Sequence, residues 1–217
     1  MRIVIAGGHG KIALILTRQL AGRGDEVVGL VRNPAHEADV RDAGGEPVLL
    51  DLETAALEDV AGILRGADAV VFAAGAGAGS GAARKDTVDR GAAVLLADAA
   101  ERAGVRRYVM ISSMGAATGG EPGMDEVFAA YLDAKKAADE DLMSRDLDWT
   151  VIRPGGLTDD PGTGTVSVGR PGRGTIPRED VARVVVAALD DPATAGVVTE
   201  VVSGPHRVAV ALADLTD

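Results

Sequence analysis

The chain has 217 residues, 22 of them lysine or arginine and 33 aspartate or glutamate, which gives a formal net charge of −11. This length suits one α/β domain with a sizeable core, and the acidic balance, with no long basic run, argues against nucleic-acid and anionic-membrane partners. The absence of cysteine excludes disulfides, thiolate metal ligands and thiol nucleophiles.

Other features of the composition narrow the class of protein. Hydrophobic residues make up 47% of the chain and aromatic residues 2%, so the core must be built from Val, Ile, Leu and Ala, as buried parallel strands prefer. His9, His36 and His206 have no metal-ligand spacing, so we expect no metal site. The first residues lack the charged and apolar regions of a signal peptide, and no apolar run reaches about 18 residues, so we expect a cytoplasmic protein.

The N-terminal stretch predicts a strand, a tight turn and a helix. The apolar run Arg2–Ala6 stops at three glycines and a histidine, Gly7–Gly10. Apolar residues then recur at four-residue spacing from Ile12 to Leu20, as on one face of a helix that starts at Lys11. Strand, glycine turn and helix in this order form half of a βαβ dinucleotide-binding unit.

The glycines have a chemical use in such a turn. Gly7 can take backbone angles closed to residues with a Cβ atom, and Gly10 leaves room for a pyrophosphate to approach the unpaired N–H groups of the helix. Ala13 lets the helix lie close to the strand, so Gly8-x-Gly10-x-x-Ala13 fits the usual fingerprint. Tight strand-to-helix turns also need glycine when they bind nothing, but the position between strand and helix favours cofactor binding.

Strand and helix patterns then alternate along the chain. Short apolar runs predict strands at residues 27–31, 46–50, 69–73, 105–111 and 149–152. The segments between them predict helices at residues 35–43, 55–64, 86–103 and 125–145, and loops at residues 75–83 and 112–123. This alternation predicts an α/β fold, a doubly wound parallel sheet with helices on both faces.

The pattern changes after Gly156. A short strand at residues 165–168, a helix at 180–189 and a last strand at 197–202 lie among loops rich in Gly and Pro. This part is too short for an independent domain. We therefore expect a single domain over residues 1–217, with a small substrate cap contributed by about residues 155–180 and the C-terminal segment.

The carboxyl ends of the strands should form the ligand-binding edge, as they do in other open parallel sheets. The residues that the pattern places there are Gly7–Gly10, Arg32, Asp51, Ala73–Gly75, Ser112–Ser113 and Pro154–Gly156.

Arg32 bears on the choice of cofactor. Folds specific for NAD place an acidic residue ~20 residues beyond the glycines, where it accepts a hydrogen bond from the ribose 2′-hydroxyl. Arg32 stands there instead, and its guanidinium would pair with a 2′-phosphate, so we expect NADP(H) in preference to NAD(H). A solvated surface arginine is the alternative. Asp51 could accept from the adenine amine or cap the next helix, and the sequence favours neither.

Tyr131 and Lys135 lie four residues apart in YLDAK and share a helix face. A phenol is a poor proton donor or base near neutral pH, but a neighbouring ammonium favours its phenolate. A serine of the preceding pair, Ser112-Ser113, could hydrogen-bond a substrate carbonyl while Tyr131 protonates it. The alternative is a surface tyrosine packed on the lysine stem. The catalytic interpretation is favoured because this tyrosine, one of two in the chain, follows a strand that ends in serines.

A family resemblance rests on five segments, GGHGKIA, FAAG, VMISSMG, YLDAK and RPGGL. Together they resemble the short-chain dehydrogenase/reductase superfamily, and most of all its atypical, NmrA-like NAD(P)-binding branch. The resemblance covers nearly the whole chain. It implies a Rossmann fold, with Tyr131 as acid and base and Lys135 on the nicotinamide ribose. It also implies that Ser113 rather than Ser112 hydrogen-bonds the substrate carbonyl and that Pro154–Leu157 lines the nicotinamide pocket.

The cofactor-binding residues expected on all these grounds share the carboxyl edge. They are Gly7, Gly8, His9, Gly10, Lys11, Ile12, Arg32, Asp51, Leu52, Ala73, Ala74, Gly75, Ser112, Lys135, Pro154, Gly155, Gly156 and Leu157.

Two departures from the family pattern bear on activity. Asn33 is the only asparagine, so the catalytic asparagine of the classical members is absent, and FAAG stands where they have NNAG. The NmrA-like branch also includes members that bind a dinucleotide without turning anything over. We expect an NADP-dependent oxidoreductase acting on a small carbonyl compound, with a non-catalytic NADP(H) sensor as the alternative. Retention of Tyr131, Lys135 and Ser113 favours the enzyme, and the oligomeric state stays open.

Overall fold

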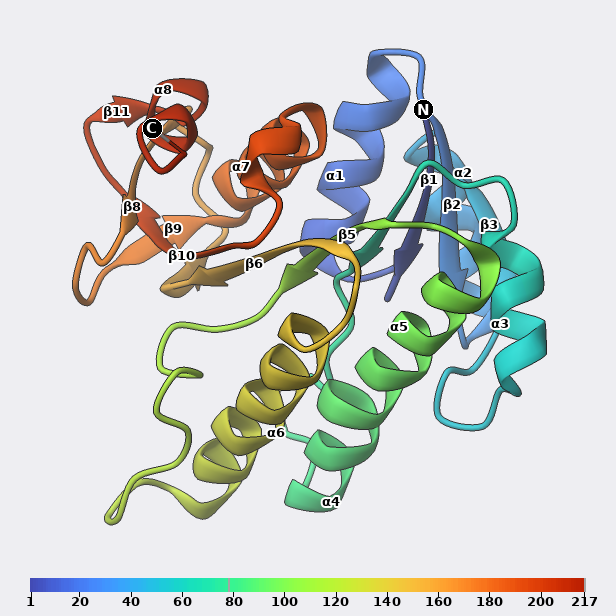
Figure 1. Cartoon of the computed structure of the whole chain (residues 1–217), viewed down its shortest axis with the longest axis horizontal. Helices are drawn as coiled ribbons and strands as arrows, with labels where there is room; N and C mark the ends of the chain where they lie inside the picture. The colour runs from blue at the N-terminus through green and yellow to red at the C-terminus, as the bar shows by residue number, and fades with distance from the viewer. Residues whose placement is uncertain (78, 217) are drawn as a thin grey trace.

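A nine-stranded, mostly parallel sheet runs through the part of the chain that the computed structural model describes, residues 1–77 and 79–216 (Figure 1). Its strands are β1 (Arg2–Ala6), β2 (Glu26–Val31), β3 (Glu46–Leu49), β4 (Ala69–Phe72), β5 (Arg107–Ile111), β6 (Asp148–Pro154), β8 (Thr165–Gly169), β10 (Val197–Ser203) and β11 (His206–Arg207). Their order across the sheet is β11-β8-β10-β6-β5-β4-β1-β2-β3, and β8 runs against both of its neighbours. The predicted parallel sheet is confirmed. Residue 78, inside the loop predicted at residues 75–83, and residue 217 lie outside the described part.

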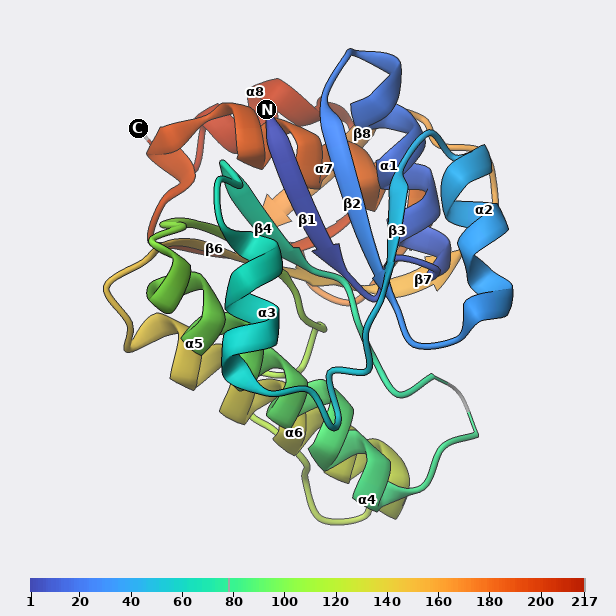
Figure 2. The ribbon, with the colours of Figure 1, turned by 90° about the vertical axis from the view of Figure 1, so that its right-hand side faces the viewer.

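Helices cover both faces of the sheet (Figures 1 and 2). On one face lie α1 (Lys11–Gly22) and α7 (Arg178–Asp190), and on the other lie α3 (Leu57–Leu64), α5 (Ala92–Ala103) and α6 (Glu126–Met143). Side chains alternate along a strand, so β1 sends Ile3 and Ile5 into the first core and Val4 and Ala6 into the second. The doubly wound architecture expected from the strand–helix alternation is therefore confirmed.

Helix α1 shows how the sequence pattern produces a packed element. Its Ala13, Leu16 and Leu20 are fully buried, and burial of each leucine contributes about 1.5–3 kcal/mol. Ile12, on the same apolar stripe, is only half-buried because it lies at the edge of a cavity. None of the helices in residues 1–77 and 79–216 combines the length and the apolar character needed to cross a membrane.

The helix predicted at residues 86–103 begins earlier than expected. α4 (Ala82–Arg84) leads into a π-helical segment (Lys85–Gly91) and then into α5, and Figure 1 shows α4 and α5 as parts of one helix. Ala82 and the charged residues after it suit a helix as well as a loop, so composition gives no clear start. The wide π turns bury Lys85, Val88 and Asp89. π turns occur mostly as short pieces and often at functional sites.

The C-terminal third contains more regular structure than its sequence pattern predicts. β7 (Gly156–Thr158) and β9 (Thr175–Pro177) form a small parallel pair, and α8 (Val208–Ala213) follows β11. β6 continues to Pro154, two residues beyond the predicted end, because proline can close a strand where its missing N–H is not needed. A Cβ on Gly155 would lie 2.4 Å from the Gly174 carbonyl oxygen, so glycine is required where the two segments cross.

The remaining elements are short. α2 (Glu37–Asp42) follows a 3₁₀ turn at Pro34–His36, and a second 3₁₀ turn lies at Pro192–Thr194. The 3₁₀ turn at Pro34–His36 and α2 take the place of the single helix predicted at residues 35–43, because Asn33 caps the first turn by accepting the Ala35 N–H at 3.0 Å.

Candidate cofactor and substrate site

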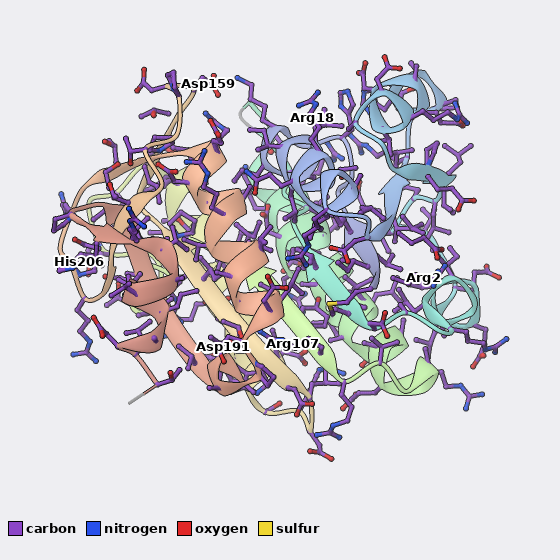
Figure 3. All side chains as sticks on the ribbon, turned by 90° about the horizontal axis from the view of Figure 1, so that it is seen from above. Arg2, Arg18, Arg107, Asp159, Asp191 and His206 are labelled. Carbon is purple, nitrogen blue, oxygen red and sulfur yellow. The ribbon has the colours of Figure 1, made fainter. Side chains whose placement is uncertain are left out.

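Two adjoining cavities lie at the carboxyl edge of the sheet, with volumes of about 260 Å³ and 700 Å³. They share the residues Gly10, Ala73, Ala74 and Gly75. Figure 3 shows the two ends of the sheet: Asp159 lies by the start of α7, on the side of the carboxyl edge, whereas Arg107 and Asp191 lie at the other end of that helix. The predicted ligand edge and the observed cavities therefore coincide.

The glycine turn forms the floor between the two cavities. Gly7 has φ +77°, and a Cβ there would lie 2.6 Å from the Ala74 Cα; a Cβ on Gly8 would lie 2.7 Å from the Gly29 Cα. Both glycines are thus required by backbone contacts of the fold itself. A Cβ on Gly10 would have more room, since its nearest neighbour, the Gly7 carbonyl oxygen, would lie at 3.2 Å. Gly10 opens onto both cavities at the N-terminus of α1. This arrangement fits a pyrophosphate.

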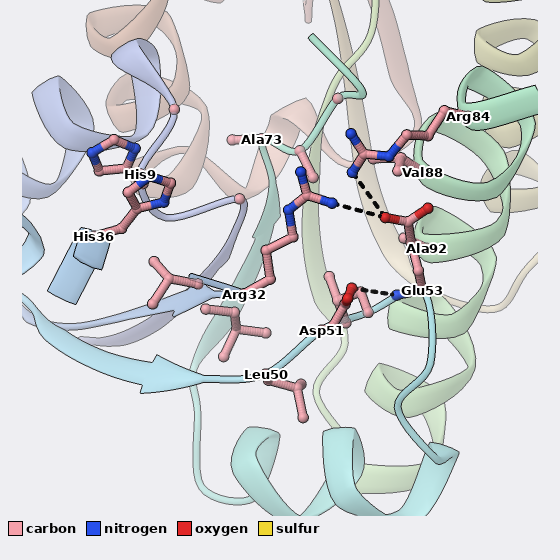
Figure 4. A pocket seen from close by; sticks show the side chains of 17 residues that line it. His9, Arg32, His36, Leu50, Asp51, Glu53, Ala73, Arg84, Val88 and Ala92 are labelled. Atoms are coloured by element: carbon pink, nitrogen blue, oxygen red, sulfur yellow. Dashed lines mark hydrogen bonds and ion pairs between the residues drawn. The ribbon is translucent and has the colours of Figure 1, made fainter. Parts of the chain in front are cut away.

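Two arginines and one glutamate stand at the wall of the first cavity (Figure 4). Glu53 Oε2 accepts from Arg32 Nη1 at 3.1 Å and from Arg84 Nη2 at 2.9 Å, and Glu53 Oε1 accepts from Thr87 Oγ1 at 2.7 Å. The Glu53 carboxylate is thus held between two guanidinium groups at the wall of the cavity. The sequence predicted a role for Arg32 but not for Arg84 or Glu53. The contact between Arg84 and Glu53 depends on how the segment after the glycine-rich loop at residues 75–83 folds back, which a sequence pattern does not show.

Asp51 lines the first cavity, and its carboxylate accepts the Glu53 N–H at 3.0 Å. The alternative role as a cap of the next helix is wrong, because α3 begins at Leu57 with Ala56 before it. Leu52 lies on the same wall. Across the cavity His9 and His36 stack with ring centroids 3.5 Å apart (Figure 4). His9 Nε2 also lies 2.7 Å from Oδ2 of Asp39, which is outside the lining.

Tyr131 lines the second cavity from α6, together with Lys135 one turn further along. Its ring stacks against Phe128 at a centroid distance of 6.0 Å. Two ammonium groups lie over the same ring, Lys85 Nζ at 5.2 Å and Lys135 Nζ at 5.9 Å from its centroid. The predicted shared helix face thus places both side chains at one cavity, and the structure adds Lys85, which the sequence did not single out.

Lys135 is buried and paired. Its Nζ lies 3.3 Å from Asp89 Oδ1 and donates to the Ile111 carbonyl at 3.3 Å. Asp89 is completely buried, and its Oδ2 accepts the Ala76 N–H at 3.2 Å. Asp89 comes from the π-helical segment and was not predicted, because its meeting with Lys135 depends on the packing of two helices that are distant in sequence.

The two serines after β5 point in different directions. Ser112 lines the second cavity and donates from Oγ to Asp139 Oδ2 at 2.8 Å, which also accepts from Arg153 Nε at 2.9 Å. Burial raises the pKa of the Asp139 carboxyl above its usual value, against the opposing effects of Arg153 and Ser112. Ser113 donates to the Met114 carbonyl at 3.2 Å and lines neither cavity. The preference for Ser113 over Ser112 gains no support from this geometry.

The other residues that the sequence placed at the site also fall into two groups, those that line a cavity and those that do not. Lys11, Ile12 and Leu157 line the second cavity, and Gly8 and Pro154–Gly156 line neither. Lys11 and Arg178, both on the second cavity, pair with the same partner, Asp159, at 2.5 Å and 2.6 Å. The segment expected as the substrate cap thus reaches this cavity through Leu157 and Arg178.

Comparisons with known proteins agree with this geometry. The model of a family described as NAD(P)H-binding matches residues 7–192. An uncharacterized sugar epimerase, YhfK of Bacillus subtilis (strain 168), is 35% identical over 217 residues, covering 99% of this chain and 100% of that protein. A solved structure named a putative NAD-dependent epimerase/dehydratase from Bacillus halodurans is 33% identical, with a TM-score of 0.91 over 99% of this chain and 100% of that chain.

A second structure, named the oxidoreductase ylbE from Lactococcus lactis, is 26% identical, with a TM-score of 0.87 over 99% of this chain and 96% of that chain. The glycine turn, the carboxyl-edge cavities and these matches together lead to one conclusion: the chain belongs to the NAD(P)H-binding family of Rossmann-type proteins.

Proposed function

We propose that the protein is an NADP-dependent oxidoreductase that reduces a small carbonyl compound. The observation that carries this proposal is the placement of Tyr131 and Lys135 on the second cavity, which meets the first at the glycine turn. A dinucleotide laid across Gly10 would have its adenosine part beside Arg32 and its nicotinamide beside Tyr131. NADPH bound in this way supplies a hydride to the carbonyl carbon of the substrate.

The residues of the chain supply the remainder of the reaction. Tyr131 donates its phenolic proton to the carbonyl oxygen, which completes the alcohol, and the ammonium groups of Lys85 and Lys135 stabilise the phenolate that remains. Asp89 fixes Lys135 in place. Ser112 is the serine on this cavity, and it would orient the carbonyl oxygen by turning its O–H, which donates to Asp139 in the structure, toward the substrate.

The choice of NADP(H) is supported by the pair Arg32 and Arg84. Both guanidinium groups reach the same carboxylate at the first cavity, and a 2′-phosphate would offer them a second anionic partner. An acidic residue at the position of Arg32 would favour the ribose hydroxyl of NAD instead.

Two alternatives follow from other observations. A sensor of the NADP(H) pool is favoured by the absence of the classical catalytic asparagine. Epimerase chemistry is suggested by the names of the relatives from Bacillus, and because an epimerase returns its cofactor to the starting oxidation state, it would oxidise no NADPH overall.

Substitution of Tyr131 by Phe tests the proposal, because it removes one hydroxyl and little volume. We expect the rate of NADPH oxidation with an active carbonyl substrate to fall ~10²–10⁴-fold and NADPH affinity to stay within a few-fold. The measurements are the decay of NADPH absorbance and a binding titration, on the wild type and the variant. Equal turnover in both would remove Tyr131 from the mechanism, and a panel of aldehydes and ketones that oxidises no NADPH would favour the sensor or the epimerase.

A further inference from the structure

The second cavity carries a buried positive charge, that of Lys85, which the proposed reaction uses only through the ring of Tyr131. Lys85 is 8% exposed, lines this cavity from the π-helical segment and donates from Nζ to the Gly77 carbonyl at 2.8 Å. It forms no ion pair within residues 1–77 and 79–216. A buried ammonium bonded to a neutral carbonyl alone is costly unless an anion joins it.

Each of the other cations of the cavity has a carboxylate partner. Lys135 pairs with Asp89, and Lys11 and Arg178 pair with Asp159. The remaining acidic residue on the cavity, Asp125, accepts the Phe128 N–H at 2.9 Å and caps α6. Lys85, Asp89 and Lys135 together therefore hold two ammonium groups and one carboxylate, which leaves one positive charge without a counterion.

Three apolar side chains also line this cavity and stay partly exposed. Val127, Phe128 and Leu157 all line it and stay 39%, 48% and 40% exposed. These are large hydrophobic side chains with much of their surface in water, and Phe128 stacks on Tyr131. A ligand with an apolar body would cover them.

We propose that the substrate of this site is a carbonyl compound with a carboxylate group, which Lys85 binds while the apolar body of the substrate packs against Val127, Phe128 and Leu157. This inference rests on the proposed function for the carbonyl group and on Lys85 for the carboxylate. The one ammonium charge without a carboxylate partner suits the single negative charge of a carboxylate better than a phosphate, which carries about −1.5 to −2 at pH 7. The ammonium lies 5.2 Å from the Tyr131 ring centroid, so a small acid held there has its carbonyl within reach of Tyr131.

The position of Lys85 separates it from the places expected for the phosphate groups of the cofactor. Lys85 lines the second cavity and not the first, and it is not among the residues Gly10 and Ala73–Gly75 at which the two cavities meet. The pyrophosphate belongs at the glycine turn, and the 2′-phosphate belongs beside Arg32 and Arg84. Lys85 is therefore available to the second ligand.

Two probes that differ in one charge test the inference. We would titrate 4-carboxybenzaldehyde and methyl 4-formylbenzoate calorimetrically into the protein saturated with NADP⁺, and then compare both as substrates with NADPH. The variants are Lys85→Met, which keeps the length of the side chain, and Lys85→Arg, which keeps its charge. The matched control is Lys136→Met, on the same helix as Lys135 but not on the cavity. Thermal melting confirms that each variant folds.

We expect the wild type and the Lys136→Met control to bind the carboxylate probe at least about tenfold more tightly than the ester, the worth of a buried charged hydrogen bond. Lys85→Met should bring the two affinities within about threefold, and Lys85→Arg should retain most of the preference. A wild type without the preference, a Lys85→Met variant that keeps it, or failure of both probes to bind would overturn the inference. A loss of NADP⁺ affinity in Lys85→Met of about tenfold or more would also overturn it, because the lysine would then serve the cofactor. A preference for the carboxylate without NADPH oxidation would support the anion site and contradict the proposed reductase.

Discussion

At the scale of single residues, Arg32 and Arg84 govern the expected choice of cofactor. Glu53 now shares its carboxylate between them, so a 2′-phosphate must compete with Glu53 and gains two guanidinium partners when it does. We expect NADPH to bind at least about tenfold more tightly than NADH, and Arg32→Asp to erase or invert that preference. Arg18→Asp is the control, since Arg18 is an exposed residue of α1 that lies on neither cavity. Fluorescence titration of both cofactors measures the ratio, and equal affinities in the wild type would contradict the role of Arg32.

Asp139 gives a prediction on pH at the same scale. Burial raises the pKa of its carboxyl above the ordinary 3.8, so the native state binds this proton more tightly than the unfolded chain does. The protonated Asp139 carboxyl therefore contributes fully to stability at pH values below its ordinary pKa. This contribution is lost as the pH rises through the raised pKa of the folded state. Asp139→Asn cannot lose a proton, so its melting temperature should rise relative to the wild type as the pH is raised from the ordinary carboxyl value through the range in which folded Asp139 would lose its proton. A difference between the two that stays constant across this range would show that Asp139 does not titrate there.

At the scale of elements, the glycine turn and α1 distinguish a packing role from a binding role. A Cβ on Gly8 would lie 2.7 Å from backbone of β2, whereas a Cβ on Gly22, in the last turn of α1, meets nothing within 4 Å. We expect Gly8→Ala to lower the free energy of unfolding by about 1–3 kcal/mol and Gly22→Ala to raise it by up to about 1 kcal/mol. Chemical denaturation of both variants checks this. Full stability in Gly8→Ala would mean that the turn can move away from β2.

The elements also show what a sequence pattern can and cannot predict. The strand–helix alternation and the face shared by Tyr131 and Lys135 depend on local spacing, so both could be predicted. The pair Asp89–Lys135 and the group Arg32–Glu53–Arg84 join residues that are distant in sequence, so they depend on how helices pack. The π-helical segment has no pattern of its own, and it sets the positions of both Lys85 and Asp89.

At the scale of the whole molecule, a chain of net charge −11 presents a site with several cations. Lys11, Lys85, Lys135 and Arg178 all line the second cavity, and they come from α1, the π-helical segment, α6 and α7. Local positive potential in an acidic protein attracts small anions selectively, which suits NADPH and an acidic substrate. The nine-stranded sheet brings these elements to one edge.

In the proposed mechanism this edge holds NADPH so that its hydride passes directly to a carbonyl carbon beside Tyr131. The most direct measurement uses NADPH labelled with deuterium at the transferred position of nicotinamide C4, with 4-carboxybenzaldehyde as the acceptor and mass spectrometry of the product. We expect an alcohol that carries one deuterium on the former carbonyl carbon, formed by the wild type and ~10²–10⁴-fold more slowly by Tyr131→Phe. Tight binding of NADPH without any labelled alcohol would contradict direct hydride transfer at this site.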